Sequence, residues 1–461
     1  MPPLTEPRVA WMPARISALW RSALIDRAVL YGLGARVWQI AAAPVTMVLI
    51  STHVSPALQG FYYTFGSLLA LQSFVELGFN NVILNVASHE WSQLRLDVRG
   101  AIEGHADARS RLVSLGRLVF TWYAVASLIF AVGVGAAGFY FFGRHPADGV
   151  SWQGPWLAVV CFTGLLLWAL PFNSLLEGCN QVATIQRLRL NQAVLSSVGL
   201  WIALVSGAGL WALVVAAAIN VLRDAWLLLF QYRRFFRPFL AKPEGPVLHW
   251  RGDLWPMQWR LALSGVVNYF AISLFNPVMF QYHGPIVAGQ MGMTLAMVYG
   301  LQSLGVAILA PKVPAFGMLI ARRDFEALDR LWRRTSLVSL GACAGGAAAV
   351  WTVVAVLRAI EAPISARLLA PGPLAVLLAG MLLMQISQCE TAYLRAHRQE
   401  PIVVMSVTTS IGIGLLVWLL GRRFGPAGAA AGYFSMAALT VAWETMIWTR
   451  CRRVWHAPAS R

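Results

Sequence analysis

Charged and amide side chains interrupt the apolar segments of this sequence, and these residues could bind an ion or a charged ligand. Gln72, Glu76 and Asn80 are spaced four residues apart, so one continuous helix would place them on one face. Arg36 and Arg223 lie in other apolar segments. A charge at mid-bilayer costs about 2.5–3.5 kcal/mol on insertion scales, so each of these residues needs a partner or a function. Carboxylates can take up protons or cations, and the planar fork of arginine binds phosphate oxygens in pairs.

Each intramembrane charge also has a structural interpretation. For Arg36 and Glu76 we favour a position facing a cavity, and the alternative is a structural Arg36–Glu76 ion pair. Arg260 and Glu390 lie near predicted cytosolic ends, where the preferred interpretation is that their charged groups reach the interface. Glu444 is interpreted as a helix–helix contact residue.

The composition requires lipid as the solvent for most of the chain. Of the 461 residues, 58% are hydrophobic and 12% are charged, and the mean hydropathy is +0.63. Soluble domains carry about 25% charged residues. The net charge of +17 does not indicate nucleic-acid binding, because the arginines lie between apolar blocks and form no single patch.

The apolar segments predict an all-α protein, because about 20 apolar residues in helical form cross a bilayer. Twelve segments qualify, and turn residues such as Gly284-Pro285 and Gly425-Pro426 separate them. The predicted spans are 29–50, 58–87, 113–142, 155–178, 189–207, 209–231, 257–281, 286–311, 335–357, 372–394, 402–420 and 426–449.

The basic residues predict the orientation of these spans. The two termini and the loops after the even-numbered spans, counted together with the span ends that adjoin these loops, hold 29 of the 36 Lys and Arg residues. Cytosolic loops of membrane proteins are enriched in basic residues, so both termini are predicted to be cytosolic. The opposite set of loops holds five basic residues, namely Arg144, Arg358, Arg367, Arg422 and Arg423.

An internal repeat predicts two halves. The segment Pro56–Gly60 shares its proline and glycine with Pro285–Gly289, at an offset of 229 residues. The triplet Leu-Gln-Ser occurs at 71–73 and again at 301–303, at an offset of 230. This pattern predicts two six-helix bundles in parallel orientation. The predicted division is a cytosolic or interfacial lead-in (1–28), an N-terminal bundle (29–240), a cytosolic linker (241–256), a C-terminal bundle (257–449) and a cytosolic tail (450–461).

No motif of a soluble enzyme is present in the sequence. It has no Gly-rich phosphate-binding loop with Lys-Ser/Thr, no His/Glu metal cluster and no nucleophile motif. The five cysteines are scattered and are interpreted as small buried residues. We therefore predict no catalytic residues, no metal and no cofactor.

The second span resembles a known transporter family. Gln59-Gly-Phe-Tyr-Tyr63, followed by Glu76-Leu-Gly-Phe79, is similar to the G-x-Y … D/E-L-G signature of lipid-linked oligosaccharide (O-antigen or polysaccharide) flippases. These belong to the multidrug/oligosaccharidyl-lipid/polysaccharide exporter superfamily. The connection 321–330 resembles the cytosolic linker after their eighth helix.

This resemblance implies a V-shaped, pseudo-twofold pair of bundles around a cationic cavity in the bacterial cytoplasmic (inner) membrane. Alternating access would move an undecaprenyl-diphosphate glycan from the inner to the outer leaflet. The partners would be membrane lipid, a glycan polymerase and glycosyltransferases. Glu76 would couple transport to a proton or sodium ion. The predicted substrate-binding residues of the cavity are Arg36, Asn80, Arg223, Arg260 and Asn268.

Two other functions stay open. A cation-coupled drug exporter of the same superfamily is expected to have a cavity dominated by carboxylates. A membrane-embedded glycosyltransferase or polymerase is expected to carry a large extracytoplasmic loop, and the outer loops here are short.

Overall fold

The computed structural model describes residues 27–76, 79–97, 99–144, 149–248, 269, 272–397, 399 and 401–456. Most of these residues are helical, and one short antiparallel hairpin pairs β1 (Leu94–Leu96) with β2 (Ile102–Gly104). Two of the predicted cavity residues, Arg260 and Asn268, lie outside the described residues.

The helical elements fall into two groups along the chain. The N-terminal elements are α2 (Arg27–His53), α3 (Pro56–Leu69), α4 (Gln72–Glu76), α5 (Phe79–Trp91), α6 (Ala106–Gly143), α7 (Gln153–Gly178), α8 (Val182–Val205), α9 (Trp211–Trp226), the π-helical η1 (Leu227–Gln231), α10 (Arg233–Phe236) and η2 (Arg237–Leu240). The C-terminal elements are α12 (Phe275–Leu309), η4 (Ala310–Lys312), α13 (Val313–Ala321), α14 (Phe325–Ala359), η5 (Pro363–Arg367), α15 (Pro371–Ala396) and α16 (Val403–Trp455).

Nine helices within the described residues are long and apolar enough to cross a membrane, and the chain is a multi-pass α-helical membrane protein. The longest, α16, contains the predicted eleventh and twelfth spans. Its backbone leaves helical geometry at Gly425, where φ is 62°. An ideal Cβ on Gly428 would lie 2.2 Å from the oxygen of Leu420, so the two parts of α16 pack antiparallel. Glycine permits this reversal because positive φ strains other residues.

The turn between the predicted seventh and eighth spans is built in the same way. Within α12, Gly284 has a φ of 85° and Pro285 follows it. The Tyr299 hydroxyl donates to the Ile272 carbonyl at 3.2 Å, so the segments before and after this turn lie side by side. The Gly-Pro pairs at 284–285 and 425–426 are therefore both reversals of the chain.

The predicted second span is not one helix. α3 ends at Leu69, and α4 begins at Gln72 after a turn. The Leu71 N–H donates to the Leu68 carbonyl at 3.1 Å, and the Ser73 hydroxyl donates to the Ala70 carbonyl at 2.9 Å. Such local bonds compete with helical ones. This break lies before Gln72, so Gln72 and Glu76 stay together on α4. Asn80 lies on α5, beyond residues 77–78, which are outside the described part of the chain, and the shared face stays a prediction.

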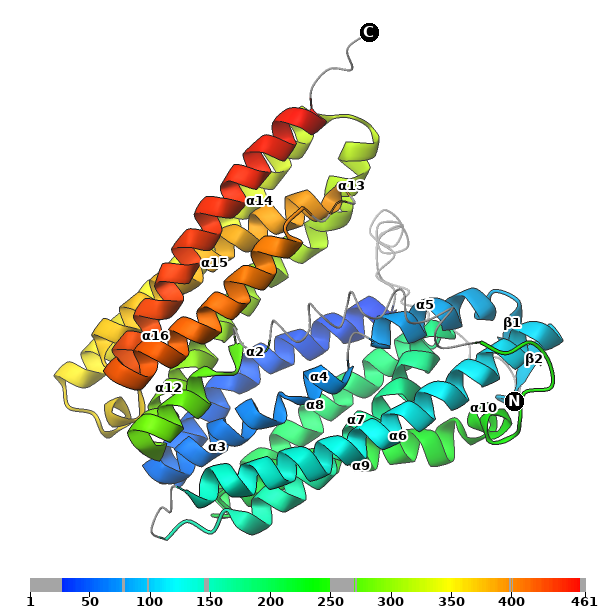
Figure 1. Ribbon diagram of the computed structural model, residues 1–461, viewed down its shortest axis with the longest axis horizontal. Coiled ribbons are helices and arrows are strands. Elements are labelled where there is room, and N and C mark those ends of the chain that lie inside the picture. Colours follow the sequence, from blue (N-terminus) through cyan, green and yellow to red (C-terminus); the bar gives the residue numbers. More distant parts are fainter. Residues whose placement is uncertain are drawn as a thin grey trace, which may run out of the picture.

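The two groups of helices form a V (Figure 1). They meet where α3 packs on α12, and they diverge toward the ends that carry α5, β1, β2 and α13. At the contact, the Gln59 side-chain amide donates to the Gly289 carbonyl at 2.8 Å. A Cβ on Gly60 would lie only 1.9 Å from the Pro285 oxygen. The two repeat segments of the sequence thus pack on each other.

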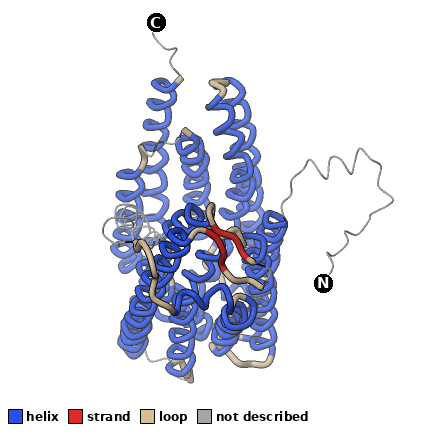
Figure 2. The backbone as a smooth tube through the Cα atoms, turned by 90° about the vertical axis from the view of Figure 1, so that its right-hand side faces the viewer, coloured by secondary structure: helices blue, strands red, loops and turns tan. Residues whose placement is uncertain are grey.

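Aromatic side chains complete the contact between the two groups. The rings of Phe61 and Phe280 meet edge to face with centroids 4.9 Å apart. Phe142 lies 5.3 Å from Phe280, and Trp156 lies 5.3 Å from Phe142. The small β1–β2 hairpin lies at the opposite, diverging end (Figure 2). The V is therefore closed at the end with few basic residues and open at the arginine-rich end.

Candidate functional site

Arg36 and Glu76 lie apart in this conformation. Arg36 is exposed on α2, and Glu76 is half-buried on α4. The ion pairs among the described residues join other side chains, so the alternative Arg36–Glu76 ion pair is not formed. Glu76 lies within electrostatic range of Tyr123 on α6, whose buried hydroxyl has no hydrogen-bond partner in this part of the structure.

Asn80 lies in a helix–helix contact. Its side-chain oxygen accepts a hydrogen bond from the Ser174 hydroxyl at 3.1 Å, which joins α5 to α7. One polar group of this predicted cavity residue therefore already has a partner inside the N-terminal bundle.

The adjacent residues Arg223 and Asp224 on α9 have different environments. Asp224 is buried and accepts hydrogen bonds from Gln192 on α8 at 2.9 Å and from Asn173 on α7 at 3.4 Å. The Arg223 guanidinium lies 5.6 Å from the centre of the Trp226 ring, and its Nε is buried without a partner among the described residues. Asp224 thus connects three helices.

The C-terminal bundle contains a carboxylate pair that the sequence analysis missed. Glu444 on α16 is fully buried and accepts hydrogen bonds from Ser387 and, at 2.5 Å, from Thr391 on α15. Glu390 on α15 is 5% exposed and accepts from Thr445 at 2.8 Å. The second oxygen of Glu390 is buried without a hydrogen-bond partner among the described residues.

This arrangement corrects the interpretation of Glu390, which was expected to reach the interface. Glu444 does lie in a helix–helix contact, as predicted. The signal available in the sequence was the spacing of Ser387, Glu390 and Thr391, which puts three polar groups on one face of a helix. A match to Glu444 could not be read from the sequence, because it depends on how α15 and α16 pack.

The carboxylate pair could hold a proton or a monovalent cation. Glu390 and Glu444 are close enough to interact electrostatically, and Arg395 is the cation that acts on Glu444. Among the described residues, two buried carboxylates lie beside one arginine, which leaves one negative charge uncompensated if both are ionised. Among the residues that the structure describes, no group of three or more His, Cys, Asp or Glu is placed to hold a metal ion. The predicted lack of a cofactor stays a prediction.

Comparison with known proteins gives the fold. No family model matches the chain, and no curated protein matches it. An inward-facing structure of a multidrug resistance MATE family transporter of the MOP superfamily aligns with a TM-score of 0.59 at 14% identity, over 92% of this chain and 96% of that one. The chain has the MATE transporter fold.

Two further structures show the same MATE fold. The MATE multidrug transporter DinF-BH aligns with a TM-score of 0.53 at 13% identity, over 95% of this chain and 98% of that one. An outward-facing MATE structure aligns with a TM-score of 0.50 at 12% identity, over 93% and 96% of the two chains. MOP stands for multidrug/oligosaccharidyl-lipid/polysaccharide, the superfamily whose signature the second span resembles.

Proposed function

We propose that this protein is a cation-coupled exporter of the MOP type that works by alternating access. The observation that carries the proposal is the buried Glu390–Glu444 pair inside one half of a V-shaped transporter fold. An exporter that uses an ion gradient needs a group whose charge state changes with the ion and whose surroundings change with conformation. A carboxylate pair beside a single arginine supplies such a group.

The coupling follows from the packing of α15 on α16. When a proton or cation occupies the pair, the two helices can stay packed without an unpaired charge between them. When it leaves, repulsion between the carboxylates favours a rearranged state. Ion binding can bias the two conformations only as far as its affinity differs between them, and a difference of about 10⁴-fold reverses a 99:1 population. Glu76 on α4 is the second candidate coupling group.

For the substrate we propose an amphipathic organic compound, and for this exporter an organic cation. The described interior carries buried carboxylates in both bundles, Asp224 in the first and the Glu390–Glu444 pair in the second. The drug-exporter alternative requires a cavity dominated by carboxylates, and these carboxylates lie in helix–helix contacts inside the two bundles. The likeness in fold to multidrug transporters supports the same choice.

A second candidate substrate is the lipid-linked glycan. It is favoured by the signature in the second span and by Arg36, which is exposed on α2 and has no carboxylate partner among the described residues. Arginine suits a diphosphate because its fork binds phosphate oxygens in pairs. The gap of the V would let a polyprenyl tail stay in lipid. A glycan polymerase and glycosyltransferases would then be partners.

The test is transport in proteoliposomes. Purified protein is reconstituted, and movement of a fluorescent organic cation is followed under an imposed proton or sodium gradient. We expect Glu390→Gln to abolish the dependence on the gradient while substrate exchange without a gradient continues. The matched control is Glu326→Gln, which removes one carboxylate from an exposed position on α14. Gradient dependence that persists in a folded Glu390→Gln protein would remove the pair from the mechanism.

The two substrates are separated in cells. A deletion strain that accumulates lipid-linked glycan on the inner leaflet, and that is not rescued by Arg36→Gln, would favour the glycan. Movement of the organic cation with no accumulation of glycan would favour the drug exporter.

A further inference from the structure

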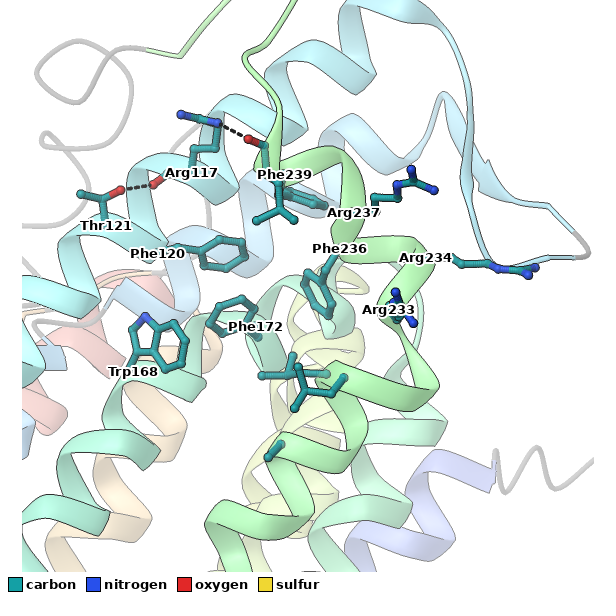
Figure 3. Close-up of a pocket in the computed structure, with 14 residues that line it drawn as sticks. Arg117, Phe120, Thr121, Trp168, Phe172, Arg233, Arg234, Phe236, Arg237 and Phe239 are labelled. Atoms are coloured by element: carbon teal, nitrogen blue, oxygen red, sulfur yellow. Dashed lines mark hydrogen bonds between the residues drawn. The ribbon is translucent and has the colours of Figure 1, made fainter.

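A cavity of about 1250 Å³ opens at the arginine-rich end of the N-terminal bundle (Figure 3). All of its lining residues belong to the N-terminal group of elements. Helices α6, α7 and α9 form its walls, and η1, α10 and η2 close its end. Its lining residues are Arg117, Phe120, Thr121, Trp168, Phe172, Ala225, Leu228, Leu229, Arg233, Arg234, Phe236, Arg237, Phe239 and Leu240.

The floor of the cavity is aromatic and well packed. The rings of Phe120 and Phe172 stack with centroids 3.9 Å apart, and Trp168 meets Phe172 edge to face at 5.5 Å. Phe239 lies against Gly116, where a Cβ would come within 2.2 Å of its ring. Absence of a side chain at Gly116 therefore lets the segment after α9 fold back onto α6.

The rim of the cavity is cationic. Arg117 donates to the Leu240 and Ala241 carbonyls at 3.0 and 2.8 Å, which fixes the end of η2. Arg233 and Arg237 are exposed, and neither guanidinium has a hydrogen bond or an ion pair to another described residue. The lining includes four arginines and no carboxylate. The rim thus offers guanidinium groups that are free to bind an anion.

The π-helical turn η1 directly precedes the rim arginines Arg233, Arg234 and Arg237. In η1 the Tyr232 N–H donates to the Leu227 carbonyl at 2.9 Å, an i to i−5 bond that widens the end of α9. Such turns are rare and are frequently found at functional sites. Here the widened turn leads directly into Arg233 and α10.

We propose that this cavity binds an anionic phospholipid of the leaflet at the arginine-rich end. The phosphate would lie between Arg233 and Arg237, and an acyl chain would lie along the aromatic floor. Leu229 and Leu240 at the mouth are 63% and 84% exposed, which suits a mouth that opens to lipid. A soluble anion would use the rim alone and leave the apolar floor without an occupant. The proposal needs only a membrane-embedded chain and does not depend on the transported substrate.

The experiment measures lipid retention by the purified full-length protein. Protein in detergent is mixed with phosphatidylglycerol or with phosphatidylcholine of identical acyl chains, and bound lipid is counted by native mass spectrometry. We expect phosphatidylglycerol to be retained over phosphatidylcholine. The double variant Arg233→Gln/Arg237→Gln should lower the affinity for phosphatidylglycerol about 25-fold, since each basic residue near an anionic surface contributes roughly five-fold. The matched control, Arg333→Gln/Arg334→Gln, removes two exposed arginines from α14 and should change affinity less than about two-fold.

Each other outcome overturns the proposal. Equal retention of both lipids would show that charge does not select the occupant. Equal loss in both double variants would show a general charge effect. Competition by glycerol phosphate at the same affinity as the lipid would assign the rim to a soluble phosphate compound. Unchanged phosphatidylglycerol retention in the rim variant would mean that something else, such as a second copy of the chain, occupies the cavity.

Discussion

Replacement of Gly60 by alanine tests whether the V is held by a close approach of two backbones. A Cβ at Gly60 would lie 1.9 Å from the Pro285 oxygen. Carbon–oxygen contacts across helix interfaces normally measure about 3.3–3.6 Å, so α3 and α12 must separate locally by roughly 1.4 Å. Overpacking of this kind costs about 1–3 kcal/mol. We therefore expect Gly60→Ala to lower the thermal transition of the purified protein by roughly 2–5 °C.

The control for this prediction lies further along the same helix. A Cβ on Gly66 would have no atom within 4 Å. Gly66→Ala should therefore raise the free energy of unfolding by about 1 kcal/mol through helix propensity alone. Gly60→Ala gains the same contribution in addition to the cost of its contact with α12. The difference between the two variants isolates the contact with α12. If Gly60→Ala is as stable as Gly66→Ala, the close approach does not exist in the protein and the reasoning about the closed end of the V fails.

Two other predictions concern pH and topology. Burial lowers the pKa of His397 and of His456 at the arginine-rich end of the C-terminal bundle. The unfolded chain then binds more protons than the folded one, so stability is lost as the pH falls below about 6.5. The thermal transition temperature should therefore fall between pH 7.5 and pH 5, and the double variant His397→Gln/His456→Gln should show a smaller fall. Equal falls in the two proteins would contradict the assignment. Reporter fusions should place Arg144 outside and Arg234 in the cytosol, and the reversed pattern would refute the orientation inferred from the basic residues.

The helices were predictable because the signal for a span is summed over about 20 residues. Gly284 and Gly425 were recognisable as turns, since each precedes a proline and only glycine accepts the required positive φ without strain. The break after Leu69 was not predictable from hydropathy. It depends on a few local hydrogen bonds, including that of Ser73, inside a segment that stays apolar overall.

The candidate site was less predictable than the fold. Polar residues within the membrane could be named from the sequence, but their partners depend on packing. Asp224 meets Gln192 and Asn173 from two other helices, and Glu390 lies inside the bundle although its position near a helix end suggested the interface. The position of a residue along a predicted span indicates its depth in the membrane. It does not indicate whether its side chain points into the bundle or toward lipid.

The single-glycine reversal at Gly425 has a consequence for probes of the closed end of the V. The helices before and after it stay packed up to the turn, as the approach of Gly428 to Leu420 shows. A protease needs several residues of extended chain, and an antibody needs a protruding loop, so neither should find a target there. An epitope inserted between Gly425 and Pro426 would have to separate the two packed helices, so this turn is a poor site for a tag. For the same reason the turn should resist proteolysis.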